Sequence, residues 1–194
     1  MDAERAAWQR TLHSSILQQT NLLESCRAVA HRATQGLSIS QSNNWPHTIG
    51  LYYLTLGCAS LYQAVLEGTS FDPSGASLEK AVEVLRRNSQ QDCIPCGLLT
   101  RAWWRSFICA HTGPESAQED LDEAWEIAER GPMKLHLADI HLYRARLFFR
   151  EAKYPWESPT ADLAAARSLI EKCGYGLRKD EFEDAEFAIL GTSP

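Results

Sequence analysis

The sequence predicts an all-α fold, an α-solenoid of stacked antiparallel helix pairs, and the main observation behind this prediction is an internal repeat. The segments 78–85, 121–128 and 163–170 align without gaps, at offsets of 43 and 42 residues. Upstream of them, leucine and alanine also recur every 43 residues, as Leu56, Leu99 and Leu142 and as Ala59, Ala102 and Ala145. A period of this length is typical of helix pairs that bury their apolar faces against neighbouring pairs. Such arrays usually bind other molecules.

The predicted array has four helix pairs in a single domain, followed by a capping helix. The pairs are expected over residues 2–36, 47–90, 97–130 and 133–173, and the capping helix over 180–190. The second helix of each pair is the more regular one. In 121–128, for example, apolar residues recur at helical spacing with acidic residues between them. One side of this helix is therefore expected to pack and the other to face water.

The first helices are expected over residues 2–18, 47–67, 97–110 and 133–153. Between the first two pairs, residues 36–46 are rich in Ser, Asn and Gln, and Asn44-Trp45-Pro46 is expected to stop any helix. We therefore expect a loop over 36–46. The many acidic residues of the final helix are expected to form the polar outer face that ends a solenoid.

The amino-acid composition argues against several classes of protein. Of 194 residues, 44% are hydrophobic and 23% are charged, as in an ordinary soluble domain. The net charge of −6 argues against nucleic acid as the partner. Acidic residues near the start argue against a signal peptide, and no apolar run is expected to span a bilayer, so we expect a cytoplasmic protein with no membrane partner. Six cysteines in this length are too few for a disulfide scaffold, so the thiols are expected to be reduced.

The repeated small residues carry a resemblance to the tetratricopeptide repeat (TPR). The alanines of the first helices, and the Leu-x-x-Ala pairs that end at Ala81, Ala124 and Ala166, resemble the TPR pattern with a period lengthened by its loops. The sequences of residues 97–102, 121–130 and 135–142 are similar to those of TPR arrays at the C-terminal end of bacterial signalling proteins of the STAND or effector type. The phosphate-binding loop of an ATPase is absent from the sequence. The resemblance therefore implies a sensor module or a fragment rather than the ATPase itself.

The leading hypothesis is a non-enzymatic scaffold that binds a partner protein or peptide, or another domain of its own parent, through the concave face formed by the first helices. The candidate groove positions are Tyr53, Ser60, Gln63, Trp103, Ser106, Phe107, Asp139, Arg146 and Arg150. Aromatic anchors beside arginine donors suit an extended acidic peptide or a partner helix. Trp103 and Phe107 fit a plain core role equally well. The alternative function is a ligand-sensing module of a STAND-like protein.

Two arginines are assigned a structural role. Arg101 and Arg144 repeat at 43 residues. Repetition of a charged residue across pairs indicates an ion pair to the neighbouring acidic second helix rather than a ligand contact.

Recognisable chemical motifs are few. Cys93 and Cys96, separated by two residues near a predicted helix start, could form a redox centre or half a zinc site, and the helix dipole would favour a thiolate at Cys96. The sequence has no second Cys-x-x-Cys pair and no βαβ pattern, so a thiol redox enzyme is the least favoured hypothesis. His136 and His141 are five residues apart and would point about 140° away from each other on a helix. We expect no catalytic residue, no metal and no cofactor.

Overall fold

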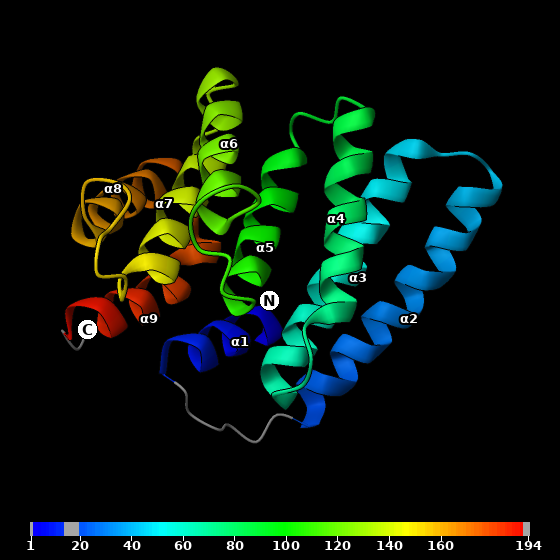
Figure 1. Ribbon diagram of the computed structural model, residues 1–194, viewed down its shortest axis with the longest axis horizontal. Helices are drawn as coiled ribbons and strands as arrows, with labels where there is room; N and C mark the ends of the chain where they lie inside the picture. The colour runs from blue at the N-terminus through cyan, green and yellow to red at the C-terminus, as the bar shows by residue number, and fades with distance from the viewer. Residues whose placement is uncertain (1, 14–19, 192–194) are drawn as a thin grey trace.

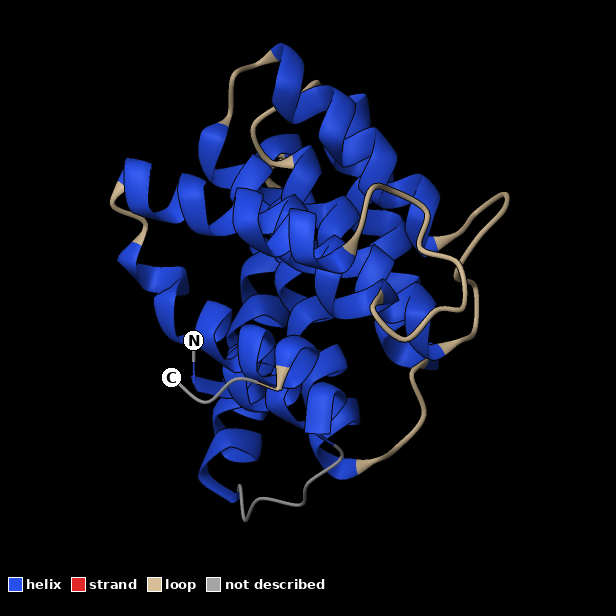
Figure 2. Cartoon of the chain, turned by 90° about the vertical axis from the view of Figure 1, so that its left-hand side faces the viewer, coloured by secondary structure: helices blue, strands red, loops and turns tan. Residues whose placement is uncertain are grey.

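A computed structural model describes residues 2–13 and 20–191, and this part of the chain contains helices and no strand (Figures 1 and 2). The α-helices are α1 (Asp2–His13), α2 (Thr20–Ser42), α3 (Pro46–Glu67), α4 (Asp72–Arg87), α5 (Ile94–Phe107), α6 (Ala117–Arg130), α7 (Lys134–Phe148), α8 (Pro159–Cys173) and α9 (Lys179–Leu190). A single 3₁₀ turn, Gly176–Arg178, precedes α9. The prediction of an all-α fold is confirmed.

The helices pack in the sequential order expected of a helical repeat. Helix α3 packs against α4, α5 against α6, and α7 against α8, and each pair also contacts the next (Figure 1). The recurring leucine and alanine positions lie in these interfaces. Leu99, Ala102, Leu121, Ala124, Leu142 and Ala145 are all buried, as the repeat predicts. Small residues at the crossings let the helix backbones approach closely, and this explains their recurrence.

The helix ends follow from local sequence signals. Ser116 accepts a hydrogen bond from the Glu119 backbone N–H at 3.2 Å, and Ser158 accepts one from the Ala161 N–H at 3.0 Å, so each serine caps the start of its helix. Gly68 ends α3 with a φ of 71°, a left-handed conformation that glycine adopts without strain. These residues set the turns that hold successive helices against one another.

The segment 36–46 is an exception to the prediction, because α2 continues to Ser42 instead of giving way to a loop. Its serine and asparagine side chains bond back to the helix instead of interrupting it. The Ser42 hydroxyl, for example, donates to the Ser38 carbonyl one turn back at 2.9 Å. The helix stops where Asn44 takes a positive φ of 51° and Pro46 begins α3. The predicted helix stop at Asn44-Trp45-Pro46 is therefore confirmed, but the polar residues before it are helical and do not form a loop.

Helix α3 corrects the expectation that no segment has the composition of a membrane span. It has 22 residues with a mean hydropathy of 1.3, and it is the one helix of the described part of the chain that is long and apolar enough to cross a bilayer. In the structure it packs between α2 and α4, and its buried face includes Leu61, Val65 and Leu66. Within the fold, 39% of this apolar window is buried, so part of its hydropathy reflects packing against α2 and α4.

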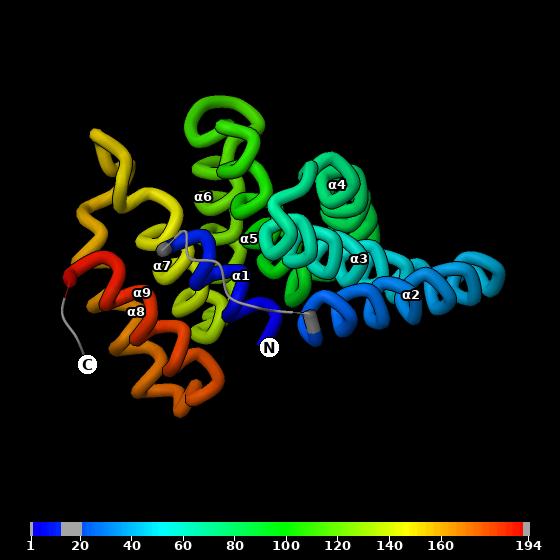
Figure 3. The backbone as a smooth tube through the Cα atoms, turned by 90° about the horizontal axis from the view of Figure 1, so that it is seen from below, coloured from blue at the N-terminus to red at the C-terminus, as the bar shows by residue number. Residues whose placement is uncertain are grey.

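Helix α1 departs furthest from the predicted pairing. It ends at His13, and residues 14–18 of the predicted first helix lie outside the described residues. Instead of pairing chiefly with α2, α1 crosses the array and contacts α3 and α9 (Figure 3). Its buried residues join the main hydrophobic core, which also includes Trp103 of α5 and Tyr143 of α7. The predicted first pair over 2–36 is therefore not formed in the same way as the later pairs.

Candidate binding site on the first-helix face

The first helices α3, α5 and α7 form a continuous surface, here named the first-helix face, and α1 lies on it (Figures 1 and 3). The centre of the contact is Trp8 of α1. Its indole stacks on that of Trp103 in α5, with ring centroids 3.8 Å apart and an interplanar angle of 5°. Tyr143 of α7 meets the Trp8 ring edge-on at 4.9 Å. All three side chains are buried, so α1 is anchored by an aromatic cluster that spans two repeats.

Arg146 of α7 completes this cluster from the other side of the indole. Its guanidinium lies 4.6 Å from the centroid of the Trp8 ring, a cation–π contact made in the interior. Nη1 lies 3.2 Å from Oε2 of Glu181, and Nη2 donates to the Glu181 carbonyl at 2.5 Å. Burial lowers the pKa of Arg146, and the Glu181 carboxylate opposes that shift. Arg146 thus links α1, α7 and α9.

Charged side chains fix α1 along α9. Arg5 Nε lies 2.7 Å from Oδ2 of Asp184, and its Nη1 lies 2.8 Å from Oδ2 of Asp180. Gln9 donates to the same Asp184 oxygen at 3.1 Å. The acidic residues of the final helix were predicted to lie on a polar outer face, but Asp180 and Asp184 face α1. The Arg5 contacts are partly exposed, and such pairs usually contribute at most about 1 kcal/mol each.

A second, more buried network joins Glu4 to the interior. Arg178 Nη1 lies 3.1 Å from Glu4 Oε1 and 2.8 Å from Glu181 Oε1, and Arg178 Nε lies 2.9 Å from Asp139 Oδ1. Burial alone would lower the pKa of Arg178, but the surrounding carboxylates outweigh burial and raise it. Burial raises the pKa of Glu4 despite Arg178. Asp139 is thus a partner of Arg178 and is not free to contact a ligand.

The C-terminal end of α1 is held by two arginines. Arg150 Nη2 donates to the Leu12 carbonyl at 2.5 Å, and Arg10 Nη1 donates to the Leu66 carbonyl of α3 at 2.5 Å. A cation at the last carbonyls of a helix complements both the unpaired acceptors and the helix dipole. Leu12 itself is buried.

The structure therefore brings Trp103, Asp139, Arg146 and Arg150 together around α1, but it does not leave them open. Trp103 and Arg146 are 0% and 2% exposed, so neither can contact another protein while α1 is in place. Their predicted position on the first helices agrees with the structure, but the space in front of them is filled by the chain itself.

The remaining candidate residues lie elsewhere or have partners in the chain. Phe107 stacks on Phe71 at 4.4 Å, and the Ser106 hydroxyl donates to the Trp103 carbonyl at 2.6 Å. Gln63 donates to Glu67 at 3.1 Å, and Tyr53 accepts from Gln41 of α2 at 3.2 Å. Ser60 is partly buried in α3.

Sequence reasoning missed the role of Trp8 and Tyr143. Trp8 lies in the predicted first helix over 2–18, and no repeat connects it with Trp103 or Tyr143. No sequence signal therefore points to their contact.

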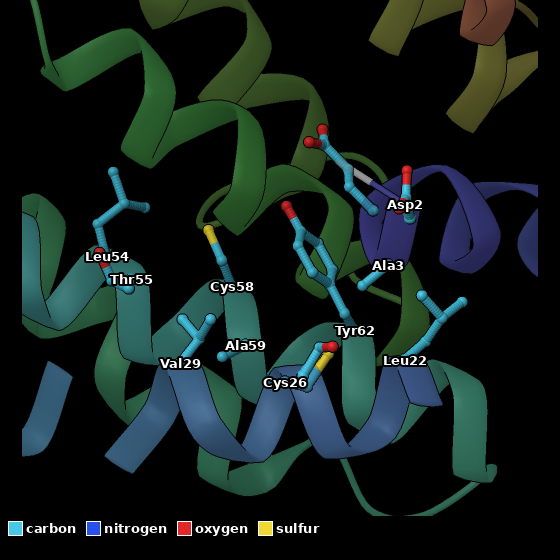
Figure 4. A pocket seen from close by; sticks show the side chains of 12 residues that line it. Asp2, Ala3, Leu22, Cys26, Val29, Leu54, Thr55, Cys58, Ala59 and Tyr62 are labelled. Carbon is cyan, nitrogen blue, oxygen red and sulfur yellow. The ribbon is translucent and has the colours of Figure 1, made fainter. Parts of the chain in front are cut away.

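A cavity of about 580 Å³ opens at the N-terminal end of α1, between α1, α2 and α3 (Figure 4). Its lining is mainly apolar, with Leu22 and Val29 of α2 and Leu54 of α3 among its walls. Its polar groups include the hydroxyl of Tyr62 and the thiols of Cys26 and Cys58. Burial raises the pKa of Cys58 to about 11 and also raises the pKa of Tyr62. Both groups are therefore neutral at pH 7.

The repeated arginines are structural, as the sequence predicts. Arg101 pairs with Asp120 of α6 at 2.6 Å and with Glu79 of α4 at 2.8 Å. Arg144 lies 3.3 Å from Asp122 of α6, and its guanidinium lies over the rings of two tryptophans, Trp125 and Trp156, at 4.7 and 4.5 Å. Both arginines thus join neighbouring helices across the repeat.

At the Cys93–Cys96 motif the pKa of each thiol is raised, away from the thiolate that a redox centre uses. Burial raises the pKa of Cys96 to about 12, aided by the Asp139 carboxylate, and burial also raises the pKa of Cys93. The shift at Cys96 is opposite to the one expected from the helix dipole. In the described residues no group of three His, Cys, Asp or Glu side chains is arranged to hold a metal ion.

No protein-family model, curated protein or solved structure matches this chain. Its function is therefore inferred from its own residues.

Proposed function

We propose that this chain is a short TPR-like α-solenoid that binds a helical segment of a partner protein on the first-helix face, in exchange for its own α1. The observation that supports this proposal is the docking of α1 on this face, where Trp8 stacks on Trp103 at 3.8 Å. A short helix with one aromatic anchor in a preformed surface is a recurring mode of peptide recognition. The cytosol remains the expected location, and no catalytic role is assigned.

Three features favour exchange over permanent occupation. A helix of 12 residues is marginal in water, so α1 depends on the face for its structure. Its polar contacts with Asp180 and Asp184 are partly exposed and weak. In addition, the indole N–H groups of Trp8 and Trp103 and the Nε–H of Arg146 are buried without a hydrogen-bond partner in the described part of the chain. Each such group costs about 1–3 kcal/mol, so α1 is not the best ligand that this face could accept.

The contacts of α1 define the chemistry of the partner segment. Because Asp180 and Asp184 face Arg5, a matching segment carries a basic residue. An aromatic residue three positions later reproduces Trp8, and a nearby acceptor such as glutamine would satisfy Trp103 Nε1 or Arg146 Nε. The sequence suggested an extended acidic peptide or a partner helix. Because Glu181 neutralises Arg146, we favour the helix, and we expect it to be basic and amphipathic.

Comparative capture from lysate of the native host tests the proposal. Tagged wild type and Trp8→Ala are compared, because the variant releases α1 while leaving the face intact. Proteins that bind the face should be enriched with Trp8→Ala and lost when Trp103→Leu is added. Trp45→Ala is the matched control, since Trp45 is 52% exposed at the far end of α2.

Equal capture by all four proteins, each shown to be folded by circular dichroism, would contradict the proposal. Loss of capture through a charge change on the outer side of α6, as in Glu126→Lys, would also contradict it.

The second hypothesis, a ligand-sensing module, has one observation in its favour, the cavity beside α1.

A further inference from the structure

We propose that the cavity between α1, α2 and α3 binds a small neutral molecule with an elongated apolar body and one hydrogen-bond donor. The cavity volume of about 580 Å³ lies within the range of roughly 300–1,000 Å³ typical of small-molecule sites. The proposal gives the ligand-sensing hypothesis a class of ligand. It holds or fails independently of partner binding on the first-helix face.

The cavity follows from the position of α1. In a regular helix pair α1 would pack along α2, but here it crosses to α3 and α9 (Figure 3). Small side chains then leave room where the three helices meet, because Ala3 of α1, Cys26 of α2 and Ala59 of α3 all line the cavity. The space is therefore built into the departure of α1 from the repeat.

The walls of the cavity are mainly apolar. Figure 4 shows Val29 of α2 close to Ala59 of α3 at the floor, with Leu54 and Leu22 at opposite ends. A ligand body that lies along this floor removes its own apolar surface and that of the walls from water, which is the main favourable contribution to binding. The shape of the lining therefore suits an elongated apolar molecule.

The charged groups at the cavity do not favour an ionic ligand. Asp2 is exposed at the rim, and the N-terminal ammonium acts on the same lining, since it opposes the rise in the pKa of Cys26 that burial causes. Glu4 pairs with Arg178 at 3.1 Å. The thiols and the phenol of the lining are neutral at pH 7, because burial raises the pKa of each. An ion would lose its hydration here without meeting an unpaired opposite charge, so a neutral ligand is preferred.

The hydroxyls of the lining define the polar group of the ligand. The Ser25 hydroxyl donates its proton to the Asn21 carbonyl at 2.9 Å, and the Thr55 hydroxyl donates to the Leu51 carbonyl at 2.8 Å. With their protons used inside their own helices, these oxygens offer lone pairs to a ligand. A hydroxyl group on the ligand, which is a donor without charge, is the matching chemistry.

The site would also couple to the position of α1. Asp2, Ala3 and Glu4 belong to α1, whereas the rest of the lining belongs to α2 and α3. A ligand that contacts both sides binds more tightly when α1 is docked, so its binding stabilises the docked state by mass action. Hydrogen exchange of the α1 amides reports this effect directly.

Three probes with one apolar body test the proposal on the full chain: octanol, octanoate and octylamine, titrated at pH 7 by isothermal calorimetry. We expect octanol to bind at least about fivefold more tightly than either ion. Val29→Trp places a larger side chain in the cavity and should weaken octanol at least about tenfold. Ala28→Trp adds the same side chain at an exposed position of α2 outside the lining, and it is the matched control that should leave octanol binding unchanged. Octanol should also slow exchange of the α1 amides in wild type.

Three results would overturn the proposed site. The first is an ion that binds as tightly as octanol, and the second is no binding of octanol at millimolar concentration. The third is unchanged octanol binding in Val29→Trp. Val29 is only partly buried, so this variant is expected to fold, and circular dichroism checks both tryptophan variants before the titrations are interpreted. Unchanged exchange of the α1 amides at saturating octanol would overturn the coupling to α1.

Discussion

Replacement of Trp8 by alanine should release α1 while the rest of the array stays folded. Trp8 is 1% exposed, and its aromatic and cation–π contacts run from α1 to Trp103, Tyr143 and Arg146 of other helices. Truncating a buried tryptophan to alanine typically costs about 3–5 kcal/mol. Because those contacts link α1 to the first-helix face, we assign most of this loss to docking of α1 and less to the α3–α8 array.

Native-state hydrogen exchange measures this loss. A loss of about 3–5 kcal/mol corresponds to exchange of the α1 amides that is about 10²- to 10⁴-fold faster, up to the rate of an unfolded segment. Amides of α5 and α6 should change much less. The control is Trp45→Ala, an exposed tryptophan whose loss should stay within about 0.5 kcal/mol. Unchanged exchange of residues 2–13 in Trp8→Ala would contradict this role of Trp8, as would equal acceleration across all helices.

Two further predictions concern packing and pH. Ala124 is fully buried where α6 crosses its neighbours, so Ala124→Leu should lower the free energy of unfolding by about 1–3 kcal/mol in urea titrations, whereas Ala164→Leu at an exposed site of α8 should change it little. Burial raises the pKa of Glu4 above its unfolded value, so the folded state binds this proton more tightly and the Glu4 contribution to stability falls as pH rises through the folded pKa. We therefore expect the melting temperature to rise less between pH 7 and pH 5 in Glu4→Gln than in wild type or in the exposed control Glu24→Gln. An identical pH dependence in all three proteins would contradict this assignment.

The helix pairs could be predicted from the sequence because their signals are local and repeated. Ala59, Ala102 and Ala145 of the first helices recur every 43 residues, and a small residue at each crossing is required wherever the pairs stack. The same repetition identified Arg101 and Arg144 as structural, because each meets an acidic residue of a neighbouring second helix. A repeated residue has a repeated environment, so its role can be inferred from the period.

The position of α1 could not be predicted in this way. It depends on Trp8 meeting Trp103, 95 positions later, and on Arg5 meeting Asp184, and neither pair belongs to the repeat. Packing of α1 and α9 therefore changes the charge and the exposure of residues on the first-helix face. Arg146 suggests a site for acidic ligands when only its own helix is considered, but in the fold Glu181 neutralises it and α1 covers it.

The end of α2 was missed for a different reason. Ser, Asn and Gln residues are common in loops, but on an exposed helix their side chains can bond to the preceding turn, as Ser42 does. Composition alone does not separate these two outcomes, and only the Asn44-Trp45-Pro46 stop is specific.

Exchange of α1 on the first-helix face can be measured by binding of the α1 peptide in trans. A fluorescent peptide of residues 2–13 is titrated into Trp8→Ala and into wild type, and its anisotropy is recorded. We expect saturable binding to the variant and binding at least tenfold weaker to wild type, where the tethered α1 occupies the face at high effective concentration. A peptide that itself carries Trp8→Ala should not bind either protein. Equal affinity of the native peptide for both proteins, or no binding to the variant, would contradict the claim that α1 is an exchangeable occupant.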